Sequence, residues 1–193
     1  MSRNAMILEK ETPDKLPQGS RRRAEFRGLI HRLFHDHSAA ALIGPGAGSR
    51  TREACWGLAK ELAADRRVVI VDVDRMLRVN PLPPTTTCLA DRVSNIWHWP
   101  PVADGSAESP HEVPASVEES DWYSNLRRAF DAVLLNCPAL ETEPAAAEIA
   151  ARADSAVLVV EAGKTKKKQI RQDERTLARR GVKLAGCILM KKR

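Results

Sequence analysis

Aromatic residues are scarce in this sequence of 193 residues: they make up 4% of it, and one of them is its single tyrosine. Alanine, leucine and valine must therefore fill the interior, a composition that suits helices layered on a buried sheet better than an aromatic-rich sandwich. The four cysteines stand far apart with no Cys-x-x-Cys pair, so neither a zinc knuckle nor a redox motif is expected. We expect them to be reduced thiols, mostly buried.

Long apolar runs are also missing. No stretch approaches the roughly 18 apolar residues that a membrane span requires, and the first residues lack the apolar core of a signal peptide. The sequence therefore predicts a cytoplasmic protein. Hydrophobic residues at 43% and charged residues at 29% are an ordinary globular balance that excludes wholesale disorder, and the length argues for one domain. The net charge of +6 permits an acidic partner without naming one.

The first residues differ in composition from the rest of the chain. Residues 1–19 are polar and contain Pro13, Pro17 and Gly19, which predicts a flexible segment ahead of a single domain over residues 20–193. In residues 21–34 apolar side chains recur every three or four positions, and a serine stands just before them. This pattern predicts a capped helix that packs on the core.

Apolar runs with strand character alternate with helical patterns along the domain. The expected strands are residues 39–43, 68–73, 132–135, 156–160 and 184–189. These runs are continuously apolar, as in strands covered on both faces. The helical patterns lie at residues 50–64, 141–152 and 164–180. The alternation predicts an α/β fold with a mainly parallel sheet and helices on both faces.

Residues 75–118 break this alternation. Seven prolines fall in the segment, which predicts a long irregular excursion. A short edge strand at residues 93–96 is expected to lead into Trp97, His98 and Trp99 before the next proline ends it. Together with Trp122, these aromatic side chains either form an exposed docking surface or roof the edge of the sheet, and the sequence favours neither reading.

A glycine-rich loop follows the first expected strand. It runs Gly44-Pro45-Gly46-Ala47-Gly48, and the next helix is expected to open at Ser49 or Arg50. Such a loop exposes backbone N–H groups, and the helix start adds positive potential, which together form a cradle for an anion such as phosphate. The P-loop signature requires a lysine directly after the last glycine and a hydroxyl next, whereas here the order is Ser49-Arg50-Thr51. The loop alone is equally compatible with a turn that binds no ligand.

The endings of the later apolar runs add to this reading. One run ends in Asp72 and Asp74, another in Asn136-Cys137-Pro138, and the last in Met190. This series resembles the cytoplasmic P-loop domain of bacterial tyrosine kinases of the capsular and exopolysaccharide type, which are relatives of the MinD and ParA ATPases. The resemblance covers residues 20–193 and implies a P-loop NTPase-like fold.

The resemblance also implies a binding site for ATP or ADP and magnesium. The family's loop reads Pro-Gly-Glu-Gly-Lys-Ser-Thr, and its counterpart here implies that these residues would hold the nucleotide: Gly44, Pro45, Gly46, Gly48, Ser49, Arg50 and Thr51. Asp72 and Asp74 match the family's acidic positions for catalysis, and with Thr51 they would hold magnesium. Asn136 replaces an acidic residue of the third motif, and Met190 replaces an asparagine that helps to hold adenine.

Each departure from the family pattern has a chemical meaning. Without a lysine at position 49, the charge on a transferred phosphoryl group loses its nearest cation, which costs on the order of 10³ in rate. Asn136 keeps the shape of an aspartate but offers no negative charge. The family's tyrosine-rich tail has no counterpart, and Tyr123 is the single tyrosine. The sequence therefore favours a pseudokinase with degenerate motifs.

The family resemblance implies partners as well. The expected role is a subunit of an exopolysaccharide or capsule export system, which regulates that system by docking to a membrane-embedded chain-length regulator. That partner would hold the protein at the inner face of the cell membrane. The helix over residues 21–34 implies a possible homo-oligomer, because the equivalent helix in the family takes part in subunit association.

Two other functions stay open. In the first, the protein is an active ATP-binding autokinase or ATPase that uses Arg50 in the role of the lysine, with Asp72 and Asp74. In the second, it is a MinD- or ParA-like positioning factor whose basic run at residues 164–168 contacts membrane or DNA. A helix start exposed to solvent explains this basic run equally well. Nucleic acid is not expected as a partner, because no aromatic side chains that could stack on bases lie beside the run.

A histidine group offers one more candidate site. His31, His35 and His37 have spacings of four and two residues, and the first pair would share a helix face as metal ligands sometimes do. Solvated residues at a helix end are the favoured interpretation, because no acidic or cysteine partner is apparent.

Overall fold

The computed structural model of the chain describes residues 28, 30, 31, 33, 34, 39–46, 50–80, 82, 88–91, 95–101 and 121–191. In this part the protein forms one sheet with strand order β3-β4-β2-β5-β1-β6-β7. All neighbouring strands are parallel except the pair β3 and β4. The strands are β1 (Ala39–Ile43), β2 (Val68–Asp72), β3 (Leu89–Ala90), β4 (Ile96–Trp99), β5 (Ala132–Cys137), β6 (Ser155–Glu161) and β7 (Leu184–Met190).

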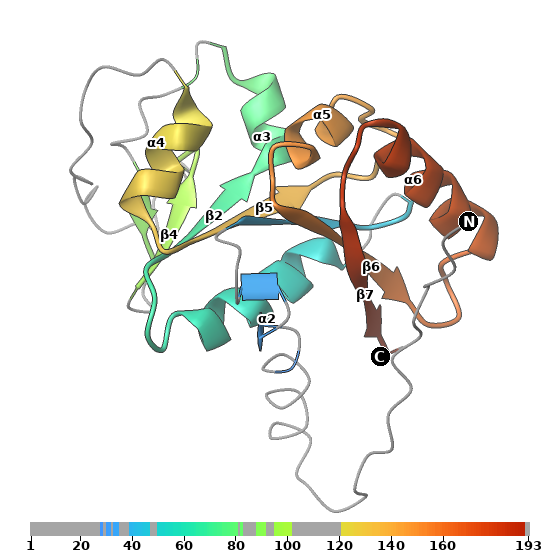
Figure 1. Cartoon of the computed structure of the whole chain (residues 1–193), viewed down its shortest axis with the longest axis horizontal. Helices are drawn as coiled ribbons and strands as arrows, with labels where there is room; N and C mark the ends of the chain where they lie inside the picture. Colours follow the sequence, from blue (N-terminus) through green and yellow to red (C-terminus); the bar gives the residue numbers. More distant parts are fainter. Residues whose placement is uncertain are drawn as a thin grey trace, which may run out of the picture.

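Helices cover both faces of this sheet (Figure 1). The five helices of the described ranges are α2 (Thr51–Leu62), α3 (Val73–Arg78), α4 (Trp122–Ala129), α5 (Ala146–Ala150) and α6 (Lys167–Arg179). Buried side chains of α2 pack on one face of the sheet, and those of α3, α4, α5 and α6 pack on the other. The predicted α/β fold, with a mainly parallel sheet between two helical layers, is confirmed.

The strands follow the apolar runs closely because each inner strand is buried on both faces. β1 is buried at all five positions, and β6 at its first five. β7 is different, because its residues alternate between half-buried and exposed. Such alternation is typical of a strand at the edge of a sheet with one covered face.

Capping aspartates mark the start of two helices that the apolar pattern did not predict. The Asp72 carboxylate accepts a hydrogen bond from the Arg75 backbone N–H at 3.2 Å and opens α3 directly after β2. Asp121 does the same for α4, where the Ser124 N–H donates at 3.3 Å. The expected strand over residues 68–73 therefore ends one residue earlier. The helix expected over residues 141–152 is shorter than predicted and reduces to α5, which is preceded by turns.

The segment from residue 75 to residue 118 has more regular structure than its prolines predict. At its described positions the predicted irregular excursion contains regular elements, because α3 continues to residue 78 and β3 and β4 follow. The edge strand expected at residues 93–96 is also misplaced. β4 contains the aromatic residues themselves, since Ile96 and Trp99 are the side chains that become buried, and β3 lies outside it at the edge. Residues 102–120 lie outside the described ranges.

The predicted helix over residues 21–34 is described only near its end. Residues 28, 30, 31, 33 and 34 are helical, and Leu33 and Phe34 are buried in the cluster that contains α2. The flexible segment predicted for residues 1–19 lies outside the described residues, as do His35 and His37. Among the helices of the described ranges, none combines the length and the apolar character needed to cross a bilayer.

Candidate functional site

Three strand ends bring the predicted site residues to one edge of the sheet. Asp72 at the end of β2 is the register partner of Asn136 in β5, and Asn136 in turn pairs with Leu42 in β1. Since all three strands are parallel, their carboxyl ends meet beside the start of α2. Ligands of open α/β sheets bind at this edge. The loop, Asp72 and Asn136 thus share one region of the molecule.

The glycine-rich loop is described from Gly44 to Gly46 and again from Arg50. Gly44 and Pro45 are buried, and Gly46 has a φ of +89°, which side chains rarely allow. A Cβ on Gly46 would lie 2.9 Å from Nε2 of Gln169, so this glycine also permits close contact with the start of α6. Thr51 opens α2 and is buried. Ala47, Gly48 and Ser49 lie outside the described residues.

Arg50, which the active-kinase hypothesis places in the lysine's role, is bound elsewhere. Its guanidinium donates to both carboxylate oxygens of Glu53, at 2.5 and 2.6 Å, and to the Lys191 carbonyl at 2.9 Å. A bidentate pair of this kind is among the stronger hydrogen-bonded ion pairs. Arg50 is therefore neutralised and held toward the chain beyond β7. The spacing of three residues on a helix could have predicted this pair from the sequence.

The two aspartates of the predicted magnesium site are engaged in different structural contacts. Asp72 caps α3, and the exposed Asp74 forms an ion pair with Arg78 at 2.6 Å. Asp74 lies inside α3 rather than at the end of a strand, which separates the environments of the two carboxylates. Over the described ranges, no group of three or more His, Cys, Asp and Glu side chains is arranged to hold a metal ion.

Buried thiols lie beneath the site. Burial raises the pKa of Cys55 in α2, with further contributions from Cys137 and from the negative charge of Asp72. Burial likewise raises the pKa of Cys137 to about 12. Both thiols therefore stay protonated and behave as small apolar groups. Cys88 is also buried and Cys187 is exposed, and all four are free, as expected of reduced and mostly buried thiols.

The aromatic cluster belongs to the core. Trp99 is fully buried and stacks on Trp122 with ring centroids 5.3 Å apart, while Trp97 packs on Phe130. The sequence left open whether these side chains form an exposed docking surface or cover the edge of the sheet, and these contacts favour the second interpretation. Tyr123 lies in the same cluster with 6% of its surface exposed, and its buried hydroxyl has no hydrogen-bond partner among the described residues. Burial raises the pKa of Tyr123.

Comparison with solved structures identifies the fold. The BceF tyrosine kinase domain is 19% identical to this chain, covers 87% of it and 75% of its own length, and superposes with a TM-score of 0.63. The VpsO kinase domain is 16% identical over 90% of this chain and 96% of its own, with a TM-score of 0.66. The chain has the fold of bacterial tyrosine kinase domains.

A third structure agrees with this assignment. The kinase domain of the Escherichia coli tyrosine kinase ETK is 16% identical to the chain, covers 97% of it and 85% of its own length, and gives a TM-score of 0.62. No family model and no curated protein matches the sequence. At these identities the likeness concerns the fold, so the P-loop NTPase-like architecture that the sequence predicted is confirmed while the chemistry must be argued from the site.

The charged side chains at the site are less suited than the backbone to binding a nucleotide and its magnesium. The glycine loop and the start of α2 are suited to a phosphate. The nearby cation, Arg50, is paired with Glu53, and the carboxylate of Asp74 is paired with Arg78. Asn136, the register partner of Asp72, is neutral and so supplies no second carboxylate beside Asp72. Among the described residues, the arginine and the carboxylates that the sequence assigned to the site are therefore engaged in contacts within the protein.

Proposed function

We propose that this protein belongs to the bacterial tyrosine kinases of polysaccharide export and acts there as a kinase-like subunit with impaired phosphoryl transfer. It regulates the export system by docking to a membrane-embedded chain-length regulator. The fold of a tyrosine kinase domain supports the family assignment. The pairing of Arg50 with Glu53 is the observation that carries the claim of impaired transfer.

The argument for impaired transfer rests on the positive charge that the reaction needs. A transferred phosphoryl group is stabilised mainly by cations and oriented dipoles. Position 49 supplies a serine, and the adjacent arginine donates its hydrogen bonds to Glu53 and to the backbone near the end of the described chain. The guanidinium of Arg50 is therefore already paired and does not replace the missing lysine.

The state of the single tyrosine supports the same proposal. Phosphorylation requires the hydroxyl to reach a reactive phosphate, and the Tyr123 hydroxyl is buried beneath Trp122 and two arginines. Arg152 and Arg127 lie over its ring, at 5.1 and 5.7 Å from the centroid. The folded chain therefore presents no tyrosine acceptor of its own within the described residues, and regulation by docking needs none.

Restoring the missing charges tests the proposal. We expect the wild-type protein to show no magnesium-dependent thermal shift with ATP, and the double variant Ser49→Lys, Asn136→Asp to show one, because the new cation and carboxylate complete the cradle. The matched control is Ser49→Met, Asn136→Asp, which adds the length of a lysine without its charge. Affinity at least about tenfold higher in the lysine variant than in the control is expected, since a charge-assisted hydrogen bond contributes about 1.5–3 kcal/mol.

A different result would favour the active-kinase hypothesis. Rapid ATP turnover or autophosphorylation by the wild-type protein would overturn the proposal, and so would a magnesium-dependent shift that Asp74→Ala abolishes. Docking is tested separately, by co-expressing the protein with a chain-length regulator from the same organism. Retention in the membrane fraction through a high-salt wash, only when the regulator is present, is the expected result. Loss of the protein in that wash would contradict docking.

A further inference from the structure

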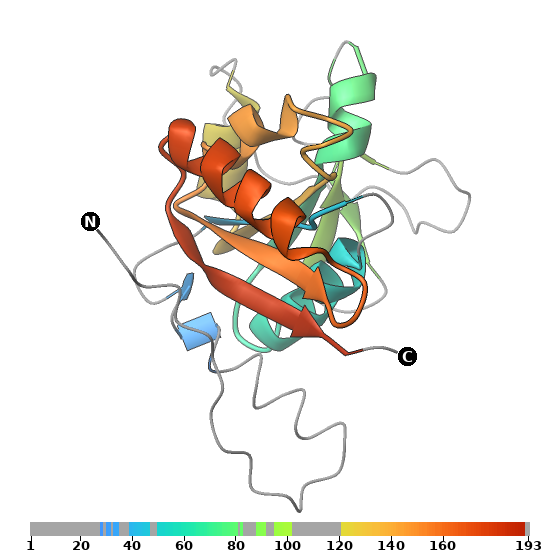
Figure 2. The ribbon, with the colours of Figure 1, turned by 90° about the vertical axis from the view of Figure 1, so that its right-hand side faces the viewer.

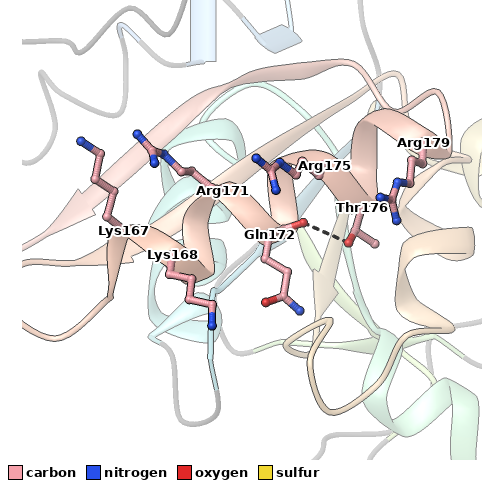
Figure 3. A pocket seen from close by; sticks show the side chains of 7 residues that line it. All are labelled: Lys167, Lys168, Arg171, Gln172, Arg175, Thr176 and Arg179. Carbon is pink, nitrogen blue, oxygen red and sulfur yellow. Dashed lines mark hydrogen bonds between the residues drawn. The ribbon is translucent and has the colours of Figure 1, made fainter.

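The outer face of α6 carries a continuous row of cations. Lys167, Arg171, Arg175 and Arg179 recur every fourth residue, and Lys168 lies beside the first of them. Four helical residues span about 6 Å, so the row extends over roughly 18 Å. Figure 3 shows these side chains projecting along the helix with Gln172 and Thr176 between them. The sequence drew attention to residues 164–168 together with Arg171 and Arg175, and the structure adds Arg179 to the row.

Among the described residues these cations form no ion pair, in contrast to many others in the protein. Arg127, Arg152 and Arg180 each form an ion pair with an aspartate or glutamate. No such pair is formed by the five cations of the α6 row within the part of the chain that the structure describes. Their side chains line an open groove of about 530 Å³. An unpaired row of this kind has a strong positive potential and suits an extended anionic partner.

An exposed apolar residue lies on the same side of the sheet. α6 runs alongside the edge strand β7 in both views of the ribbon (Figures 1 and 2). Ile188 and Met190 of β7 pack against the cluster that contains α2, so the alternate residues Cys187 and Leu189 face the side of the sheet where α6 lies. Leu189 is 63% exposed.

The combination of cations and an exposed leucine distinguishes between anionic partners. None of the described residues that line the groove has an aromatic side chain that could stack on bases. A basic helix face with an exposed apolar side chain on the same side of the sheet matches the interface of a bilayer, where headgroups meet the cations and the leucine enters the boundary of the acyl chains. We propose that the α6 row, together with Leu189 on the same side of the sheet, binds the anionic lipid headgroups of a membrane surface directly.

Vesicle binding by the full chain tests this proposal. We expect binding to vesicles of phosphatidylcholine and phosphatidylglycerol in equal amounts, weakening as salt is added, and none to phosphatidylcholine alone. Each cation near an anionic surface raises the affinity by a factor of about five. The variant Arg171→Gln, Arg175→Gln lacks two such cations and should therefore bind about 30-fold more weakly. Leu189→Ser should weaken binding about tenfold.

The matched control removes the same charge from the other face of the protein. Arg52→Gln, Lys60→Gln lies on α2, which packs on the opposite side of the sheet, and should bind vesicles like the wild type. Absence of binding to the anionic vesicles at low salt, equal loss in the control, or unchanged binding by the α6 variant would overturn the proposal. Tighter binding to duplex DNA than to vesicles through the same arginines would also overturn it. Because bare vesicles hold no regulator, these outcomes are independent of the docking test above.

Discussion

Trp99→Ala is expected to cost about 3–5 kcal/mol in the free energy of unfolding, the range measured when large buried aromatic side chains are truncated. Trp99 is fully buried, and its ring stacks on Trp122 with an interplanar angle of 16°. The substitution leaves a cavity between β4 and α4 and removes the aromatic contact as well. Since domains of this size are stable by only about 5–15 kcal/mol, the variant should be close to unfolding at growth temperature.

Urea denaturation followed by far-ultraviolet circular dichroism checks this expectation, because tryptophan fluorescence would itself change with the substitution. Trp56→Ala is the matched control. Trp56 is half-buried on α2, where it stacks on His98 and lies beneath Lys60, so its removal leaves no enclosed cavity. It should cost about 1 kcal/mol. Equal losses in the two variants would show that the cluster around Trp99 is not part of the rigid core.

Asp173→Asn should raise the free energy of unfolding by about 3 kcal/mol at pH 8 and by almost nothing at pH 4. Asp173 lies in α6 with 5% of its surface exposed, and its Oδ2 has no hydrogen-bond partner among the described residues. Burial, and then the negative charge of Glu141, raise the pKa of Asp173 from 3.8 to about 6. The folded protein therefore holds this proton more tightly than the unfolded chain does.

The sign of the effect follows from that difference. The stabilisation from the tightly held proton is fully present below pH 3.8 and is lost as the pH rises through about 6, because the folded protein must then bury a charged carboxylate. The asparagine variant does not titrate, so the two stability curves should diverge over this interval. Thermal melts across the pH range measure the divergence.

A control on the same helix separates this effect from a general change in charge. Glu174→Gln removes one negative charge from α6 at a half-buried position next to Asp173 and should leave the pH dependence in place. Glu141→Gln should reduce the divergence without abolishing it, because burial is the larger of the two causes. Parallel stability curves for the wild type and Asp173→Asn from pH 4 to pH 8 would contradict the expected ionisation.

Much of the fold was predictable because long apolar runs leave little choice. A strand such as β1, apolar at every position, must be covered on both faces, and helices must do the covering. The short elements were harder to predict. α3 and α4 depend on single capping aspartates, and β4 depends on pairing with β2 far along the chain, which overrides the prolines around it. Such pairing has no local signal.

The candidate site was likewise predictable only in part. The loop glycines and the strand ends were visible in the sequence, and their meeting at one edge follows from parallel strands. The charge at the site was only partly predictable: the spacing of Arg50 and Glu53 allows their ion pair, but the hydrogen bond from Arg50 to the Lys191 carbonyl joins residues far apart in the sequence. Asp173 was missed because nothing in the local pattern marks a helical aspartate as buried.

The sequence by itself determined the layered architecture, the order of the motifs and the absence of the lysine, because each of these depends on residue type and spacing along the chain. Only the tertiary structure decided which charges remain free. It holds Arg50 against the Lys191 carbonyl, buries Tyr123 and Asp173, and leaves the cations of the α6 row without an ion-pair partner among the described residues. Electrostatic effects depend on the distance between charges and on their burial, and both are set by contacts between residues far apart in the sequence.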